Sequence, residues 1–443
     1  MIRTVTLLAV LVFAAAVAAP QAASGNVGQF PQVRLIPEDG VSFEINNRSY
    51  SGELRIRGLS DGLSLVEEVG LDGYLAGIRE VPATWPDAAL DAQAVAARTY
   101  LAWTLSRGRS DDGRRYDFDI CATTQCQVYA GTGAGEPRWV EAVTRTAGEV
   151  LLYEGAPALA MYSSTSGGQT EPIQDVFAGS AARPYLAGAD SPDETSPYVD
   201  WTVTMPARAF VDLLAEAGIT IGELVSVDVI EPPRGSGVWE LEVVSSEGAV
   251  RLPVSRVRSV FNRHGPDLYP DILPNHRPDG RLYPQTILSY RFDARYIGLA
   301  SLDSRLRALP VDDRPVGGSI VFDGHGWGHH VGMSQYGALA MAEKGESYDS
   351  ILGHYYGGLQ PQVADGVLPE TVAVGLRWGS DSIVVRASGP FKIVSDGTEI
   401  DVVAGGAWVF QTSPDEAAGV TVISGDLLVD RLLKRFGGRL PIL

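Results

Sequence analysis

The sequence has little cysteine, little positive charge and, beyond its first residues, no long hydrophobic run. Only two of its 443 residues are cysteines, and 35 Lys and Arg stand against 54 Asp and Glu, which gives a formal net charge of −19. Phosphate contacts need clustered Lys and Arg, so we expect no nucleic-acid partner. No later stretch reaches the roughly 20 apolar residues of a spanning helix, so we expect no membrane span in the mature protein.

The residues that are present have the balance of a folded globular protein, with 45% hydrophobic and 20% charged residues. At about 100–200 residues per domain, the length suggests two or three domains. The 50 Gly and 27 Pro residues indicate many turns and loops, and they argue against a long coiled coil.

The first residues resemble an export signal. Arg3 precedes an uncharged apolar run from Val5 to Ala19, and small residues follow it. This order predicts a signal peptide over residues 1–24, cleaved between Ala18 and Gly25. The alternative is an uncleaved membrane anchor, for which the run is short. We therefore expect a secreted protein.

The two cysteines, Cys121 and Cys126, are close neighbours in the sequence. In an exported chain such a pair indicates a disulfide that closes a small loop. A zinc site is the first alternative, but it needs about four ligands and no His lies between the two cysteines. Free thiols are the second alternative. We expect the disulfide.

The best helix pattern in the sequence runs from Pro86 to about Ser106. Thr84 and Asp87 are placed for a capping box, and Gly108 follows the last turn. The apolar residues at helical spacing predict one buried stripe, formed by Leu90, Ala94, Ala97, Leu101 and Leu105.

The rest of the chain alternates between strand and helix patterns, which predicts a mixed α+β fold. A strand is expected at 53–57, a helix at 207–217, and strands at 225–230 and 239–244. A stretch rich in Pro and Asp, at about 264–285, reads as an insertion loop. After residue 358, short Val/Ile runs such as 383–386 and 420–423 predict a small β-rich C-terminal module over 359–443.

Three clusters of residues are candidates for chemistry. The first is Glu80, in a loop that also holds Trp85 and directly precedes the long helix. A glutamate that apolar neighbours partly desolvate can hold its proton near neutral pH and act as a general acid. The alternative is an ordinary solvated loop glutamate. The second cluster is the hydroxyl-rich turn 161–168, which either binds sugar hydroxyls or is simply a polar loop.

The third cluster is Gly324-His-Gly-Trp-Gly-His-His-Val-Gly-Met-Ser-Gln-Tyr-Gly337. A segment this rich in Gly, His and aromatic residues is poorly suited to a hydrophobic core, so we expect it to form a functional site. A metal site on the histidines is the alternative use of this run, but no carboxylate has zincin spacing to them.

These motifs together resemble the SpoIID/LytB family, named after a stage II sporulation protein and an amidase enhancer. The matching segments follow the family's order: Glu80-Val-Pro-Ala-Thr-Trp-Pro86, Ala92-Gln-Ala-Val-Ala-Ala-Arg-Thr-Tyr100, Cys126-Gln-Val-Tyr129, Ser164-Thr-Ser-Gly-Gly168, the run 324–337, and Ile351-Leu-Gly-His-Tyr-Tyr-Gly357. The resemblance covers roughly 50–358. It implies a SpoIID-like core over residues 25–358 with a groove where the motifs converge.

The resemblance also implies an activity. Sporulation members of the family are lytic transglycosylases that cut peptidoglycan glycan strands, and their catalytic acid is the glutamate matched here by Glu80. This chain departs from the motifs in places, because His330 stands where Gly is usual, and Ser163 and Gln125 stand where some members carry His. The last two changes argue against a zinc site of the kind some members have.

The hypothesis that follows is a secreted, cell-wall lytic transglycosylase with Glu80 as general acid and base. It needs no metal or other cofactor, and its partner is the glycan strand. We expect the side chains that hold this strand to be Tyr162, Ser164, Thr165, His325, His329, Ser334 and Gln335. The first alternative is a non-catalytic wall-binding enhancer of an amidase. The second is a metal-dependent hydrolase that uses His325 and His329.

Overall fold

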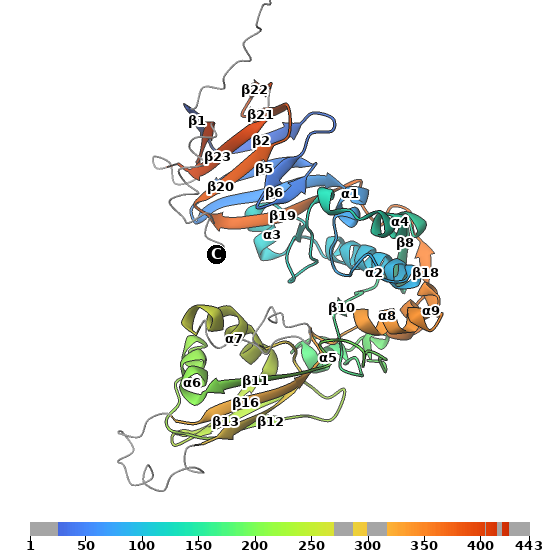
Figure 1. Cartoon of the computed structure of the whole chain (residues 1–443), viewed down its shortest axis with the longest axis vertical. Coiled ribbons are helices and arrows are strands. Elements are labelled where there is room, and N and C mark those ends of the chain that lie inside the picture. Colours follow the sequence, from blue (N-terminus) through green and yellow to red (C-terminus); the bar gives the residue numbers. More distant parts are fainter. Residues whose placement is uncertain (1–24, 270–286, 299–316, 404, 414–418, 425–443) are drawn as a thin grey trace, which may run out of the picture. The chain divides into compact units, whose positions relative to one another are not determined.

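A computed structural model describes residues 25–269, 287–298, 317–403, 405–413 and 419–424. It contains both helices and strands in several small sheets, so the expected mixed α+β class is confirmed (Figure 1). The predicted signal peptide, residues 1–24, lies outside the described residues. Within the described ranges, no helix has both the length and the apolar character needed to cross a membrane.

The chain divides into two compact units. One unit contains the residues up to 66 and those from 377 onward, and the other contains residues 67–376. Strands β6 (Gly62–Gly70) and β19 (Thr371–Ser380) carry the chain across this division in the two directions. The chain therefore leaves the first unit and returns to it.

The first unit is built from strands of both chain ends. β2 (Gln32–Pro37) pairs antiparallel with β21 (Phe391–Ser395), and β3 (Phe43–Ile45) pairs with β20 (Ser382–Ala387). Inside, the ring of Phe391 meets those of Phe43 and Trp408 edge to face. The other strands are β1 (Gly25–Phe30), β4 (Arg48–Tyr50), β5 (Glu53–Leu59), β22 (Thr398–Val402), β23 (Gly406–Thr412) and β24 (Val420–Ser424).

The strands expected at 53–57, 383–386 and 420–423 are confirmed as parts of β5, β20 and β24. The strands after residue 370 share sheets with strands from the beginning of the chain. A separate module over 359–443 stays a prediction, which a truncation experiment tests below.

The second unit is organised around α2 (Asp87–Ser106), which confirms the predicted helix. Four residues of the predicted apolar stripe, Leu90, Ala94, Ala97 and Leu101, are buried. Burial extends beyond the stripe, because 13 of the 20 residues are buried and they lie on most sides of the helix. Elements pack around it: α4 (Pro137–Arg145), α8 (Gln335–Glu343), α9 (Tyr348–Tyr355), β8 (Glu149–Tyr153) and β9 (Ala156–Pro157) (Figure 1). The alanines of its middle, residues 92–97, permit this enclosure because they leave room for neighbouring backbone.

The expected capping box at the start of α2 is also wrong. Pro86 itself is the N-cap residue, and no side chain bonds to the free N–H groups. Thr84 therefore lies too early in the chain to cap. Asp87 forms an ion pair with Arg138 of α4 instead, at 2.7 Å.

A second cluster of buried side chains in this unit lies under α6 (Ala207–Glu216) and α7 (Val254–Leu268). These helices cover β11 (Asp200–Pro206), β15 (Phe292–Ile297), β16 (Ser319–His325), and the meander β12 (Leu224–Ile230), β13 (Glu240–Ser245) and β14 (Gly248–Pro253). The helix and strands expected over 207–244 are thus confirmed. Helix α7 continues to residue 268, so the loop expected from about 264 begins later; residues 270–286 lie outside the described part.

Short elements place the motifs. α1 (Leu71–Ala76) leads to the Glu80 loop, while β10 (Tyr162–Ser163) and β17 (Met333–Ser334) form a two-stranded parallel pair. The remaining short elements are α3 (Asp111–Tyr116), β7 (Ile120–Cys121), η1 (Thr132–Ala134), α5 (Ile173–Val176), η2 (Pro184–Leu186) and β18 (Pro361–Val363).

Candidate active site

The Glu80 loop is fixed by the segment that follows the cysteines. Arg79 donates its N–H to the carbonyl of Val128 at 2.9 Å, and Ala130 donates to the carbonyl of Gly77 at 2.9 Å. Ile78 and Tyr129 form an isolated antiparallel bridge between these bonds. The backbone around Glu80 is therefore held by residues 128–130, which belong to a different family motif.

The carboxyl group of Glu80 is half-buried and hydrogen-bonded. Its Oε1 accepts the N–H of Val128 at 2.6 Å, and the side chains of Tyr162 and Gln335 also hydrogen-bond to it. Burial raises the pKa of Glu80, and the three hydrogen bonds lower it in part. Because burial is the larger effect, Glu80 keeps its proton at a higher pH than an ordinary glutamate.

A row of buried polar side chains lies behind Glu80. Tyr162 donates its hydroxyl to Oε1 of Gln127 at 2.6 Å, and Nε2 of Gln127 donates to the hydroxyl of Tyr74 at 3.0 Å. Burial and the nearby Glu80 carboxylate raise the pKa of Tyr162 well above its ordinary value. The phenol therefore stays protonated and acts as a hydrogen-bond donor.

Gln335 reaches Glu80 from the first turn of α8. Its Nε2 also donates to Oε1 of Gln93 in α2 at 3.3 Å. The preceding residue, Ser334, caps the helix by accepting the N–H of Gly337 at 3.2 Å. The end of β17 and the start of α8 thus aim the carboxamide of Gln335.

Asp193 organises the hydroxyl-rich turn from beneath. Its carboxylate is fully buried and accepts hydrogen bonds from the N–H and hydroxyl of Ser166, the N–H of Gly168 and the hydroxyl of Ser334, at 2.6–2.8 Å. Nothing in the sequence around residue 193 marks this role, because its partners lie far away in the chain. Asp193 was therefore not predicted from the sequence.

The expected glycan-holding residues fall into two groups. Tyr162 and Gln335 meet Glu80, as described above. The hydroxyls of Thr165 and Ser334 are fully buried and face Ser196 and Asp193. The backbone carbonyl of Ser164 accepts the N–H of Tyr336 at 3.0 Å. In both groups the glycan contact itself stays a prediction.

The two histidines of the third cluster have different surroundings. His325 is exposed, and its Nδ1 lies 2.7 Å from the Asp200 carboxylate. His329 accepts the N–H of Val331 on Nδ1 at 3.0 Å, and burial with the nearby Arg258 lowers the pKa of His329 to about 4. Among the described residues, no group of three or more His, Cys, Asp or Glu could hold a metal ion.

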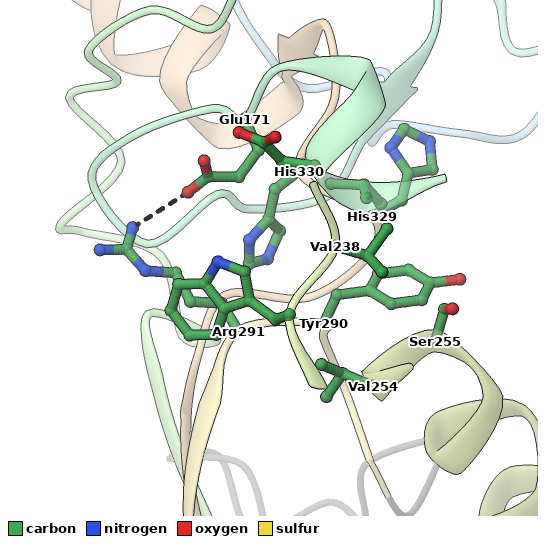
Figure 2. A pocket seen from close by; sticks show the side chains of 11 residues that line it. Glu171, Val238, Val254, Ser255, Tyr290, Arg291, His329 and His330 are labelled. Carbon is green, nitrogen blue, oxygen red and sulfur yellow. Dashed lines mark ion pairs between the residues drawn. The ribbon is translucent and has the colours of Figure 1, made fainter. Parts of the chain in front are cut away.

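His330 lines a separate pocket of about 360 Å³, open mouth included (Figure 2). Neither ring nitrogen of His330 has a partner among the described residues, and burial holds the pKa of His330 well below its ordinary value. Its φ of 61° is in the left-handed region, which fits a position where the family motif usually has Gly.

Cys121 and Cys126 are joined by a disulfide, with their Cα atoms 5.6 Å apart. Cys121 pairs with Gly375 of β19, and Cys126 directly precedes Gln127. The closed loop therefore ends where the segment that holds Glu80 begins. The motif of residues 126–129 is visible in the sequence, but the contacts that its glutamine and the next N–H make around Glu80 are not.

The site just described belongs to an α+β protein built around one partly buried carboxyl group. Residues 60–153 match the family model SpoIID, described as stage II sporulation protein. Stage II sporulation protein D of Bacillus subtilis is 28% identical, over 70% of this chain and 79% of that protein. An uncharacterized protein of Brachyspira hyodysenteriae is 27% identical, over 73% of this chain and 75% of that protein.

A third relative carries a different name. The amidase enhancer of Bacillus subtilis is 28% identical over 63% of this chain, which corresponds to 38% of that longer protein. The family model and these relatives agree with the motifs found in the sequence. Together they support the resemblance of this chain to the SpoIID/LytB family.

Proposed function

We propose that this chain is an exported lytic transglycosylase of peptidoglycan, with Glu80 as its general acid and base. The observation that carries the proposal is the single carboxyl group of Glu80 with its raised pKa. In the described part of the chain, its partners are an amide N–H, a phenol and a carboxamide, and none of them is a second carboxylate. A relative named stage II sporulation protein D and another named amidase enhancer support a role at the cell wall.

One carboxyl group is sufficient for this reaction. A glycosidase that uses water generally needs two, an acid and a base or nucleophile. In a lytic transglycosylase the C6 hydroxyl of the muramic residue attacks C1 of the same sugar. The bond from C1 to the leaving oxygen breaks, the bond from C1 to O6 forms, and the product ends in a 1,6-anhydromuramic residue. Because the attacking hydroxyl and C1 belong to the same sugar, the substrate itself holds the two reacting atoms close together.

Glu80 handles both protons in turn. The protonated carboxyl group gives its proton to the leaving oxygen, and the carboxylate then takes the proton of the attacking hydroxyl. Burial favours the first state, whereas the hydrogen bonds from Val128, Tyr162 and Gln335 favour the second. A site that stabilises both states moderately suits a group that changes between them within one turnover.

The experiment is the substitution Glu80→Gln, assayed by mass spectrometry of purified glycan for anhydromuramic ends. The amide keeps the size of the side chain and can still accept the N–H of Val128, but it has no titratable proton. We expect the rate to fall about 10²–10⁴-fold while wall binding is retained. Glu154→Gln, at an exposed turn, is the matched control and should retain full activity. Unchanged product formation by Glu80→Gln would refute the assignment.

The second candidate function is a non-catalytic enhancer of an amidase. The relative of that name favours it, since it matches 63% of this chain. The two functions are separated by the same purified protein. If the wild type forms no anhydro ends but accelerates a cell-wall amidase, the enhancer function replaces the enzyme. If chelation with EDTA abolishes activity and zinc restores it, the reaction is metal-dependent instead.

A further inference from the structure

The hydroxyl of Tyr162 has two acceptors within reach but only one proton. It donates to Oε1 of Gln127 at 2.6 Å, and it also hydrogen-bonds to the carboxyl group of Glu80. The two bonds compete, because a phenol donates once and otherwise accepts. The direction of this proton decides whether the Tyr162 hydroxyl can hydrogen-bond to the carboxylate of Glu80 or only to its protonated carboxyl group.

Gln127 fixes the direction. Its side chain is fully buried, and its Nε2 donates to the hydroxyl of Tyr74 at 3.0 Å. With the amino group committed to Tyr74, the carbonyl oxygen faces Tyr162 and draws the phenol proton. While the phenol proton points to Gln127, Tyr162 offers Glu80 only an oxygen lone pair, which suits a protonated carboxyl group. The bond that lowers the pKa of Glu80 forms only when the phenol turns and donates to the carboxylate.

The amide itself is held from both sides. Tyr74 is fully buried and its ring stacks on Tyr129 at 5.2 Å, while the hydroxyl of Tyr129 donates to the buried carboxylate of Glu67 at 2.8 Å. On the other side, Gln127 lies between the disulfide-bonded Cys126 and the residue whose N–H bonds to Glu80. An amide flip would leave two buried groups with mismatched partners, so the orientation is stable.

We propose that Gln127 is a positioning residue that acts through Tyr162, because it keeps the phenol proton away from Glu80 and so reserves the proton of Glu80 for the leaving oxygen. When Glu80 becomes a carboxylate, the phenol turns and donates to it at the cost of the bond to Gln127. The proposal deepens the proposed function, since it concerns how the same carboxyl group is regulated. It uses only groups already at the site: Tyr74 from α1, Tyr162 from β10, Gln127 and Glu80 itself.

The test is a double-mutant cycle read by the titration of Glu80. The carboxyl carbon of Glu80 is followed by ¹³C NMR and identified by its loss in Glu80→Gln. Gln127→Met keeps the volume but removes the acceptor, so the phenol is released to donate to the Glu80 carboxylate. We expect the acid dissociation constant of Glu80 to rise about tenfold, which lowers the pKa of Glu80 by about one unit. In a Tyr162→Phe background the same substitution should give no shift.

Gln93→Met is the matched control, because Gln93 is a buried glutamine that reaches Glu80 through Gln335 and not through Tyr162. Any shift that it causes should persist in the Tyr162→Phe background. If Gln127→Met fails to fold, Tyr74→Phe replaces it, since loss of that hydroxyl frees the amide to flip. The proposal is overturned if Gln127→Met shifts the pKa of Glu80 equally with Tyr162 and with Phe at that position, or if it causes no shift when Tyr162 is present.

The activity assay supplies a second readout. Because Glu80 must be protonated to act as acid, the fall of the rate at high pH should move about one pH unit lower in Gln127→Met. The titration needs no turnover, so it can succeed even if the chain makes no anhydro product. Failure of the cycle and failure of the proposed function are therefore distinct results.

Discussion

Reduction of the disulfide between Cys121 and Cys126 should loosen the segment that holds Glu80. The bond closes a loop of about six residues, and the loop-entropy relation gives a stabilisation of about 2 kcal/mol for a loop of that length. This stabilisation is local in its consequences, because Gln127 and Val128 follow Cys126 directly. Reduction therefore acts on the hydrogen bond from Val128 to Glu80.

The assay is hydrogen exchange of the peptide that covers residues 121–130, with and without reductant. A loss of 2 kcal/mol corresponds to about a 30-fold faster exchange if the segment opens locally. In the double variant Cys121→Ala/Cys126→Ala, this peptide should exchange as fast as in the disulfide-reduced wild type, and the reductant should not change its rate. Glycan cleavage should fall in parallel, since Glu80 loses the hydrogen bond from Val128 for part of the time. If exchange in this peptide does not change on reduction, the disulfide does not support the site.

Three more predictions concern other parts of the chain. Glu80→Gln should raise the free energy of unfolding at pH 7. Burial raises the pKa of Glu80 in the folded state, so the contribution of Glu80 to stability is present below its unfolded pKa and is lost as the pH rises through its folded pKa. Urea unfolding at pH 4 and pH 7 checks that the substitution stabilises the protein only at the higher pH. Asp193→Asn should destabilise the protein by about 2–4 kcal/mol and lower activity, because four donors lose a buried carboxylate; an unchanged urea midpoint would count against its role. A chain ending at Gly358 should lose solubility, since β2 and β3 lose their partners β21 and β20; a soluble, active truncated chain would support the module expected over 359–443.

The sequence by itself determined the local features. The α2 helix, the strands at 53–57 and 225–230, and the mixed α+β class all follow from short-range periodicity and turn residues, which act over one or two turns of chain. The resemblance to the SpoIID/LytB family followed from motifs that are contiguous in sequence. Glu80 was a candidate for the same reason, because its loop carries the longest of these motifs.

Only the tertiary structure decided what surrounds Glu80. Val128, Tyr162 and Gln335 come from segments 48 to 255 residues further along the chain, and no periodicity in the sequence indicates that they meet. Asp193 stayed hidden for the same reason. The enclosure of α2 on most sides also depends on partners that pack later in the chain, so its sequence predicted only one buried stripe. A hydrogen bond or a packed face between distant segments depends on the whole fold, and the residues that form it carry no local sign of their partner.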